Sequence, residues 1–286
     1  MTTTEPSSTE RSRPAVGTSA SSPTKSADDK RAALLSPKVQ TYLDRLGLFI
    51  IAIVVWELLS RTVVDPFWIS SPYLVGSRLY ELAVSGDLLW HTRATVWQAL
   101  LGLALGLVVG VALGGLLTAF PRLARALDPF VMGFYSLPRI ALAPLFILWF
   151  GIGLLSKVLM VFSLVVFIFL LNTMQGLKQV DRDLVDLMRS MRASRAFIAR
   201  RVQLPSMVPW LVAAARISVG LALIGSVLGE LLGANRGLGW YVEFSSGRLD
   251  TTGVFAGLVV LMVVAVAMNL AIDLLERYLS PVPSQS

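Results

Sequence analysis

Ionisable residues fall inside the long apolar stretches of this 286-residue chain, where their charge could support chemistry. They include Arg139, Arg216, Glu230 and Asp273, and also Glu57, for which we expect a structural role. A charged group in hydrocarbon is costly, so such residues usually pair with one another or line a path for a solute. Arg139 and Arg216 would attract an anion in a low-dielectric passage, and a buried ion pair or a snorkelling side chain is the alternative for Arg139. For Glu230 and Asp273, whose predicted depth lets them reach an interface or a partner, we expect a structural role.

The chain carries no motif for covalent chemistry. It lacks the phosphate-binding pattern G-x-x-x-x-G-K-S/T, the nucleophile pattern G-x-S-x-G and any pair of histidines on one helix. With no cysteine and a single histidine, His91, it cannot build thiolate or His-rich metal sites, so we expect no metal and no cofactor. An intramembrane enzyme is disfavoured because no nucleophile and base can be assembled. A transporter driven by ATP and built on this chain would therefore need a separate subunit that hydrolyses ATP.

The composition places the chain in a bilayer. Hydrophobic residues make up 55% of it and charged residues 15%, with a mean hydropathy of +0.70. The net charge of +7 could suggest nucleic acid, but the basic residues collect in short loops beside apolar runs, as the positive-inside rule describes. We therefore predict no nucleic-acid partner.

Six apolar runs approach the roughly 20 residues needed to cross hydrocarbon, which predicts an all-α membrane protein with six transmembrane helices. The runs cover about 46–64, 95–120, 128–150, 154–174, 207–233 and 252–275. The loops rich in Lys and Arg place both termini in the cytosol. The loops 65–94 and 234–251 should face outward, and within the first we expect a short surface helix over 72–90, with Tyr80 and Trp90 at the headgroups.

The predicted domain organisation is one six-span domain over 37–280 with a tail at each end. Residues 1–36 are crowded with Ser, Thr and Pro and should form a flexible cytosolic tail. Residues 281–286 form a short C-terminal tail, and residues 175–206 form a polar cytosolic loop between spans four and five.

Two patterns within the spans predict how they pack. Span two carries a glycine every fourth residue, at Gly102, Gly106, Gly110 and Gly114. Such a stripe lets another helix approach closely, either inside the bundle or across a dimer seam. Span three is interrupted by Pro138 and Pro144, and its freed backbone groups could face a water-lined cavity. Together with Arg139 and Arg216, these prolines are the candidates for a pathway wall.

The loop over 175–206 has the pattern of a docking element. Its first helix places apolar residues at positions i, i+3, i+4 and i+7, and these are Leu184, Leu187, Met188 and Met191. Ser194 can cap a second short helix that carries Phe197, Ile198 and Val202, and Leu204-Pro205 should end it. Motion of a partner docked here would pass directly into the flanking spans.

These segments resemble the membrane subunit of bacterial ABC importers, in the branch for nitrate, sulfonates, taurine and related small molecules. The resemblance runs from about Leu46 to Leu279 and is carried by PLFILWFGIGLLSKV, by the loop itself, by GANRGLGW and by FAGLVVLMVV. The loop matches the family signature Glu-Ala-Ala, three residues, Gly, nine residues, Ile-x-Leu-Pro. Asp186 stands for the Glu and Val202 for the Ile, whereas Leu204-Pro205 match outright.

The departure from the signature is Arg192, which replaces the family's Gly. Leu187 and Met188 also replace the two Ala residues, which makes the helix face bulkier. Gly is favoured at a tight turn, so Arg192 must either adopt an unfavourable backbone conformation or shift the turn toward Ala193 and Ser194.

The resemblance implies the following partners and contacts. Cytosolic ABC ATPase subunits would dock on Asp186, Leu187, Met188, Met191, Arg192, Phe197, Ile198, Leu204 and Pro205. It further implies a second permease copy, an extracytoplasmic solute-binding protein, and a place among the lipids of the bacterial inner membrane. No ATP hydrolysis is expected on this chain.

The substrate class implied is a small anion, and an aliphatic sulfonate or taurine is our first expectation. Nitrate, bicarbonate and a pyrimidine precursor of thiamine are the alternatives within the same importer class. A carrier driven by an ion gradient is the alternative from another class, which the elaborate cytosolic loop disfavours.

Overall fold

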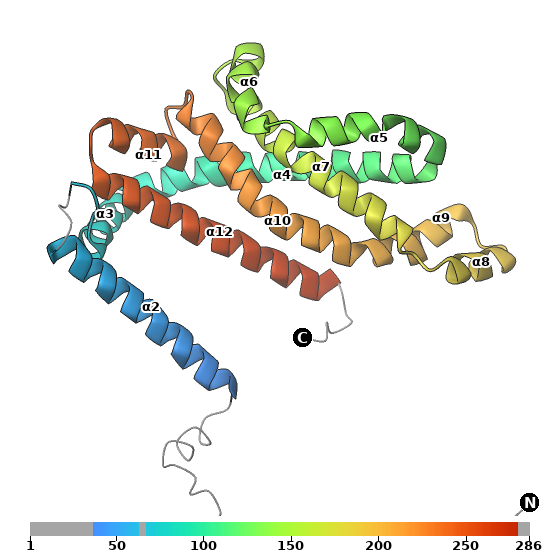
Figure 1. Ribbon diagram of the computed structural model, residues 1–286, viewed down its shortest axis with the longest axis horizontal. Coiled ribbons are helices and arrows are strands. Elements are labelled where there is room, and N and C mark those ends of the chain that lie inside the picture. Colours follow the sequence, from blue (N-terminus) through green and yellow to red (C-terminus); the bar gives the residue numbers. More distant parts are fainter. Residues whose placement is uncertain (1–36, 63–66, 280–286) are drawn as a thin grey trace, which may run out of the picture. The chain divides into compact units, whose positions relative to one another are not determined.

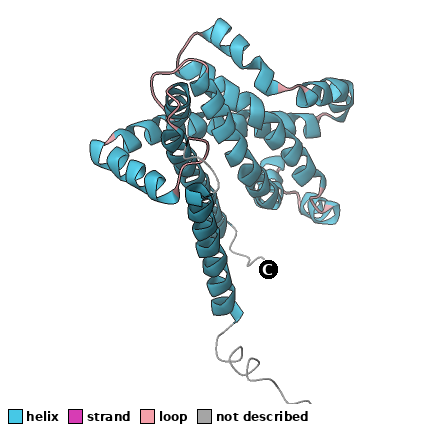
Figure 2. Cartoon of the chain, turned by 60° about the vertical axis from the view of Figure 1, so that its left-hand side comes forward, coloured by secondary structure: helices cyan, strands magenta, loops and turns pink. Residues whose placement is uncertain are grey.

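A computed structural model describes residues 37–62 and 67–279, and every regular element in those ranges is a helix (Figure 2). This confirms the predicted all-α class. The predicted tails, 1–36 and 281–286, lie outside the described residues. The chain divides into two compact units, Met1–Val54 and Val55–Ser286.

The α-helices in chain order are α2 (Pro37–Thr62), α3 (Pro72–Ser85), α4 (Asp87–Ala119), α5 (Pro121–Ser136), α6 (Ala143–Phe150), α7 (Leu154–Lys178), α8 (Arg182–Ser190), α9 (Arg195–Ile198), α10 (Leu204–Leu231), α11 (Leu238–Gly247) and α12 (Thr251–Leu279). A 3₁₀ turn, η1 (Arg139–Leu142), precedes α6, and a π-helical turn, η2 (Ala199–Gln203), precedes α10.

Four of the described helices are long and apolar enough to cross a membrane. They are Asp87–Ala119, Leu154–Lys178, Arg195–Leu231 and Thr251–Tyr278, which coincide with predicted spans two, four, five and six. Predicted span three is a bent pair, α5 followed by η1 and α6, with 79° between its two parts. The first predicted span lies mostly on α2, which is not among the four, so the six-span count stays a prediction.

Two local expectations for the spans need correction. The predicted short helix over 72–90 begins at Pro72 as expected but is shorter, because α3 ends at Ser85 and Trp90 belongs to α4. Gly86 separates the two helices in the left-handed conformation, with φ of 86°. Span three does break at Pro138, but Pro144 lies in the first turn of α6, where a proline starts a helix without cost.

The core of the second unit is the contact among α4, α7 and α10, with α8 and α9 at one end and α11 at the opposite end (Figure 1). Val161, Val165 and Phe169 of α7 are almost completely buried there. The glycine stripe of α4 lies against this face of α7. A methyl group on Gly110 would lie 2.6 Å from both the Phe169 Cβ and the Val166 carbonyl oxygen. The close approach of α4 and α7 therefore requires the missing side chains.

This contact makes a stability prediction. Gly110→Ala should lower the apparent melting temperature of the purified chain in detergent, because overpacking of this kind costs about 1–3 kcal/mol. Gly115→Ala is the matched control, since it lies on the same helix and a Cβ there has no neighbour within 4 Å. Both substitutions gain the same helix propensity, so their difference isolates the clash. Equal melting temperatures would refute the packing assignment.

Candidate functional site

The loop between α7 and α10 begins with a capped helix. The Asp181 carboxylate accepts hydrogen bonds from the backbone N–H groups of Asp183, at 2.8 Å, and Leu184, at 3.5 Å. This satisfies two of the free donors at the start of α8. The helical spacing predicted one apolar face on α8. In the structure, the apolar side chains lie on two faces, one packed against the loop and one exposed.

The inner face anchors the loop. Val180, Ile198 and Val202 are buried together, and Val185, Met188 and Ala193 pack against them. Because Val180 follows α7 and Val202 precedes α10, this cluster, hereafter the anchor cluster, joins the loop to both helices. Of the residues predicted to dock an ATPase, Met188 and Ile198 therefore lie in or against the loop's own core.

The outer face presents apolar side chains to solvent. Leu187 is 57% exposed and Met191 is 71% exposed, although the loop around them is polar. Asp186, Arg192, Phe197 and Leu204 are also exposed, and Asp186 pairs with Arg189 at 3.1 Å. Exposed apolar side chains on a fixed helix are what a docking surface requires.

Arg192 takes the left-handed conformation, with φ of 59°. The Ala193 N–H donates to the Met188 carbonyl at 3.0 Å, and the Arg192 N–H donates to the Arg189 carbonyl at 2.9 Å. This is the hydrogen-bond pattern that closes many helices at a left-handed glycine. Of the two outcomes expected for Arg192, the strained backbone is therefore the one observed, and the turn stays at the family position.

The second helix of the loop starts as predicted but does not end as predicted. The Ser194 hydroxyl accepts from the Phe197 N–H at 3.2 Å. The expected stop at Leu204-Pro205 is wrong, because the helix continues from Arg195 to Leu231. The turn η2 accounts for this: the Leu204 N–H donates to the Ala199 carbonyl, five residues back, and Pro205 sits in the first turn that follows.

A buried polar cluster lies at the opposite end of α10. Glu230 is fully buried and accepts a 2.7 Å hydrogen bond from the Gly239 N–H. The Thr95 hydroxyl of α4 lies 2.9 and 3.0 Å from its two carboxylate oxygens and accepts from the Leu238 N–H at 2.8 Å. The Gly237 N–H donates to Nδ1 of His91 at 3.1 Å. This cluster therefore holds the segment 237–239 to both α4 and α10.

Sequence reasoning gave Glu230 a structural role without finding its partners. The signal lay in the glycines of GANRGLGW. A Cβ on Gly239 would lie 3.0 Å from the Glu230 carboxylate, and one on Gly237 would overlap it. The two glycines thus leave the space in which the Glu230 carboxylate lies against this segment and accepts from the Gly239 N–H.

The two arginines predicted to line a solute path both bind to other groups of the protein itself. The Arg139 guanidinium donates to the carbonyls of Ser163, Leu164 and Tyr135 at 2.7–3.0 Å, which fastens the bend after α5 to α7. Arg216 pairs with Asp273 at 2.9 Å and Glu276 at 2.6 Å, which links α10 to α12. A contribution of either arginine, or of Pro138 and Pro144, to a solute path stays a prediction.

The long apolar helices of the bundle are those of a membrane protein. Residues 102–281 match the model of the binding-protein-dependent transport system inner membrane component, and the chain belongs to this family. It is thus the permease subunit of an ABC importer and a multi-pass inner-membrane protein.

Known relatives and solved structures agree with this family. The formylaminopyrimidine transport permease protein ThiX of Halalkalibacterium halodurans is 36% identical over 233 residues, covering 82% of this chain and 93% of that protein. The putative aliphatic sulfonates permease SsuC of Bacillus subtilis is 31% identical and covers 82% and 86%. The taurine permease TauC of Escherichia coli is 28% identical and covers 82% and 87%. A chain of the MetNI methionine ABC transporter in an inward-facing conformation is 25% identical, with a TM-score of 0.60, covering 69% of this chain and 98% of that one.

The left-handed Arg192 yields a prediction about the loop. Arg192→Gly should slow amide hydrogen exchange over residues 188–198 about fivefold, because the left-handed conformation costs a non-glycine residue about 1 kcal/mol. Arg192→Ala removes the same side chain but keeps the backbone cost, so its exchange should match the unchanged protein. If the two variants exchange alike, backbone strain at Arg192 is excluded.

The Glu230 cluster yields a second prediction. Glu230→Leu leaves the Gly239 N–H without its buried acceptor, at a cost of about 1–3 kcal/mol, and leaves the Thr95 hydroxyl only the His91 carbonyl at 3.3 Å. Trypsin should then cleave the purified chain faster at Arg236, which lies in the segment that the cluster holds. Glu243→Leu, on the exposed side of α11, is the control and should leave cleavage unchanged. Equal cleavage in both variants would show that Glu230 does not hold this segment.

Proposed function

We propose that this chain forms the translocation path for a small anionic solute, such as an aliphatic sulfonate or taurine, and that separate cytosolic ATPase subunits drive it by docking on the loop 175–206. One observation carries the docking proposal: α8 exposes Leu187 and Met191 while the anchor cluster fixes it to the ends of α7 and α10. A surface that is apolar, exposed and rigidly held can both bind a partner and transmit its motion.

The continuous helix from Arg195 to Leu231 supplies the transmission route. Its 37 residues span about 55 Å at 1.5 Å per residue. One end carries Ile198 and Val202 of the anchor cluster, and the other carries Glu230. A displacement of α8 would therefore move α10 and, through Glu230, the segment 237–239. In this proposal the loop faces the cytosol, as do both termini.

The substrate proposal is supported by relatives named for sulfonate and taurine transport. A second candidate is a formylaminopyrimidine, because the relative named for that solute is more similar, at 36% identity.

The bent pair after α4 suits a second permease copy. No residue of α5 is buried, and its exposed side chains include Phe130, Phe134 and Tyr135. A homodimer formed through this face would place the two bends, each fastened by Arg139, beside a shared path. An extracytoplasmic solute-binding protein would then deliver the solute to the end that carries α11.

If the ATPase subunits dock on α8, a variant that alters the exposed face of α8 should no longer bind them. The double variant Asp186→Arg, Leu187→Asp should abolish co-purification of the ATPase subunits, since it reverses a charge and places a carboxylate on the exposed apolar face. The control is Glu81→Arg, Val84→Asp, which likewise reverses a charge and places a carboxylate at an exposed apolar position of α3. If the α8 variant still co-purifies with the ATPase and transports normally, the docking surface lies elsewhere.

A further inference from the structure

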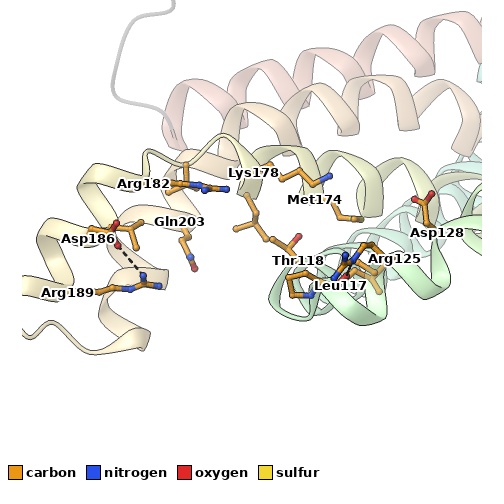
Figure 3. Close-up of a pocket in the computed structure, with 15 residues that line it drawn as sticks. Leu117, Thr118, Arg125, Asp128, Met174, Lys178, Arg182, Asp186, Arg189 and Gln203 are labelled. Carbon is orange, nitrogen blue, oxygen red and sulfur yellow. Dashed lines mark hydrogen bonds and ion pairs between the residues drawn. The ribbon is translucent and has the colours of Figure 1, made fainter.

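A cavity of about 860 Å³ separates the loop from the turn between α4 and α5 (Figure 3). Arg189 and Gln203 line one side of it, and Thr118 and Arg125 line the other. The cavity therefore lies between an element that moves in the proposed mechanism and an element of the fixed bundle.

The cavity carries an excess of positive charge. Four basic residues line it against two acidic ones: Arg125, Lys178, Arg182 and Arg189 against Asp128 and Asp186. Asp186 is already paired with Arg189. In the part of the chain that the structure describes, neither Lys178 nor Arg182 forms an ion pair, and Arg125 donates only to the Pro121 carbonyl, at 3.3 Å. These basic side chains can therefore bind an external anion.

A second, apolar cavity adjoins the first. It measures about 640 Å³ and shares Pro121 and Arg125 with the basic cavity. Leu116, Phe120 and Leu123 supply most of its apolar lining. A small soluble anion has no apolar part to bury in the second cavity. An amphiphile with an anionic head would occupy both cavities at once.

We propose that the two cavities together bind an anionic phospholipid, with its phosphate among Arg125, Lys178 and Arg182 and an acyl chain beside Leu116 and Phe120. Basic pockets at the cytoplasmic ends of membrane helices select anionic headgroups in this way. The proposal rests on the proposed function in one respect, that this end of the bundle faces the cytosol. A bound phosphate would bridge α5 to the base of α8 and so steady the docking surface.

The test compares lipid binding to the purified full-length chain. Mixed micelles containing phosphatidylglycerol and phosphatidylcholine are used, and native mass spectrometry reports the lipid retained. We expect phosphatidylglycerol to be retained preferentially. Lys178→Gln, Arg182→Gln should weaken its binding roughly 30-fold, from about 1 kcal/mol per basic residue. The matched control is Arg195→Gln, Arg200→Gln, two exposed basic residues of the same loop that do not line the cavity, and it should bind as the unchanged chain does.

A second variant tests the acyl chain. Ala119→Trp fills the apolar cavity and should also reduce phosphatidylglycerol retention, without removing a charge. Competition by inorganic phosphate with no effect of Ala119→Trp would identify a site for a free anion and overturn the lipid assignment. Equal retention of both lipids, or equal loss in the control variant, would overturn it as well. No ATPase is present, so failure of lipid binding is distinguishable from failure of docking.

Discussion

The anchor cluster is the contact that fixes α8 to the helical bundle of this permease. Val180, Ile198 and Val202 are each less than a tenth exposed, and together they tie a short polar loop to the ends of two long apolar helices. Without them α8 would be a surface helix on a tether, and a force applied to it would be absorbed by the loop. With them, α8 packs directly against the start of the helix Arg195–Leu231, and in the proposed function the two move together.

The glycine stripe supplies the fixed partner for that element. Gly102, Gly106, Gly110 and Gly114 bring α4 against α7 so closely that no side chain fits between them. In the proposed function, this packing gives α10 a surface to move against. At its far end, the Glu230 carboxylate accepts a hydrogen bond from the Gly239 N–H, which links α10 to the segment 237–239. Short contacts thus join the α4–α7 pair, α10 and the segment 237–239.

The sequence predicted what local patterns determine and missed what depends on distant partners. Four spans were located because their apolar runs are long, and Ser194 was identified as a cap from its side chain and position. At Arg192 the residue spacing allowed either a strained backbone or a turn shifted toward Ala193, and it could not distinguish the two. The helix through Pro205 was missed because a π-helical turn has no composition signal. Glu230 lies 135 residues from Thr95, so only the tertiary fold brings them together.

The most direct test of the central claim is cysteine labelling at Met191, whose side chain is exposed in a chain that has no native cysteine. Met191→Cys would be treated with a membrane-impermeant maleimide in inside-out vesicles, with and without the ATPase subunits, and in intact cells. We predict labelling only in vesicles that lack the ATPase, and protection when it is bound. Labelling in intact cells, or equal labelling with and without the ATPase, would contradict a cytosolic docking loop.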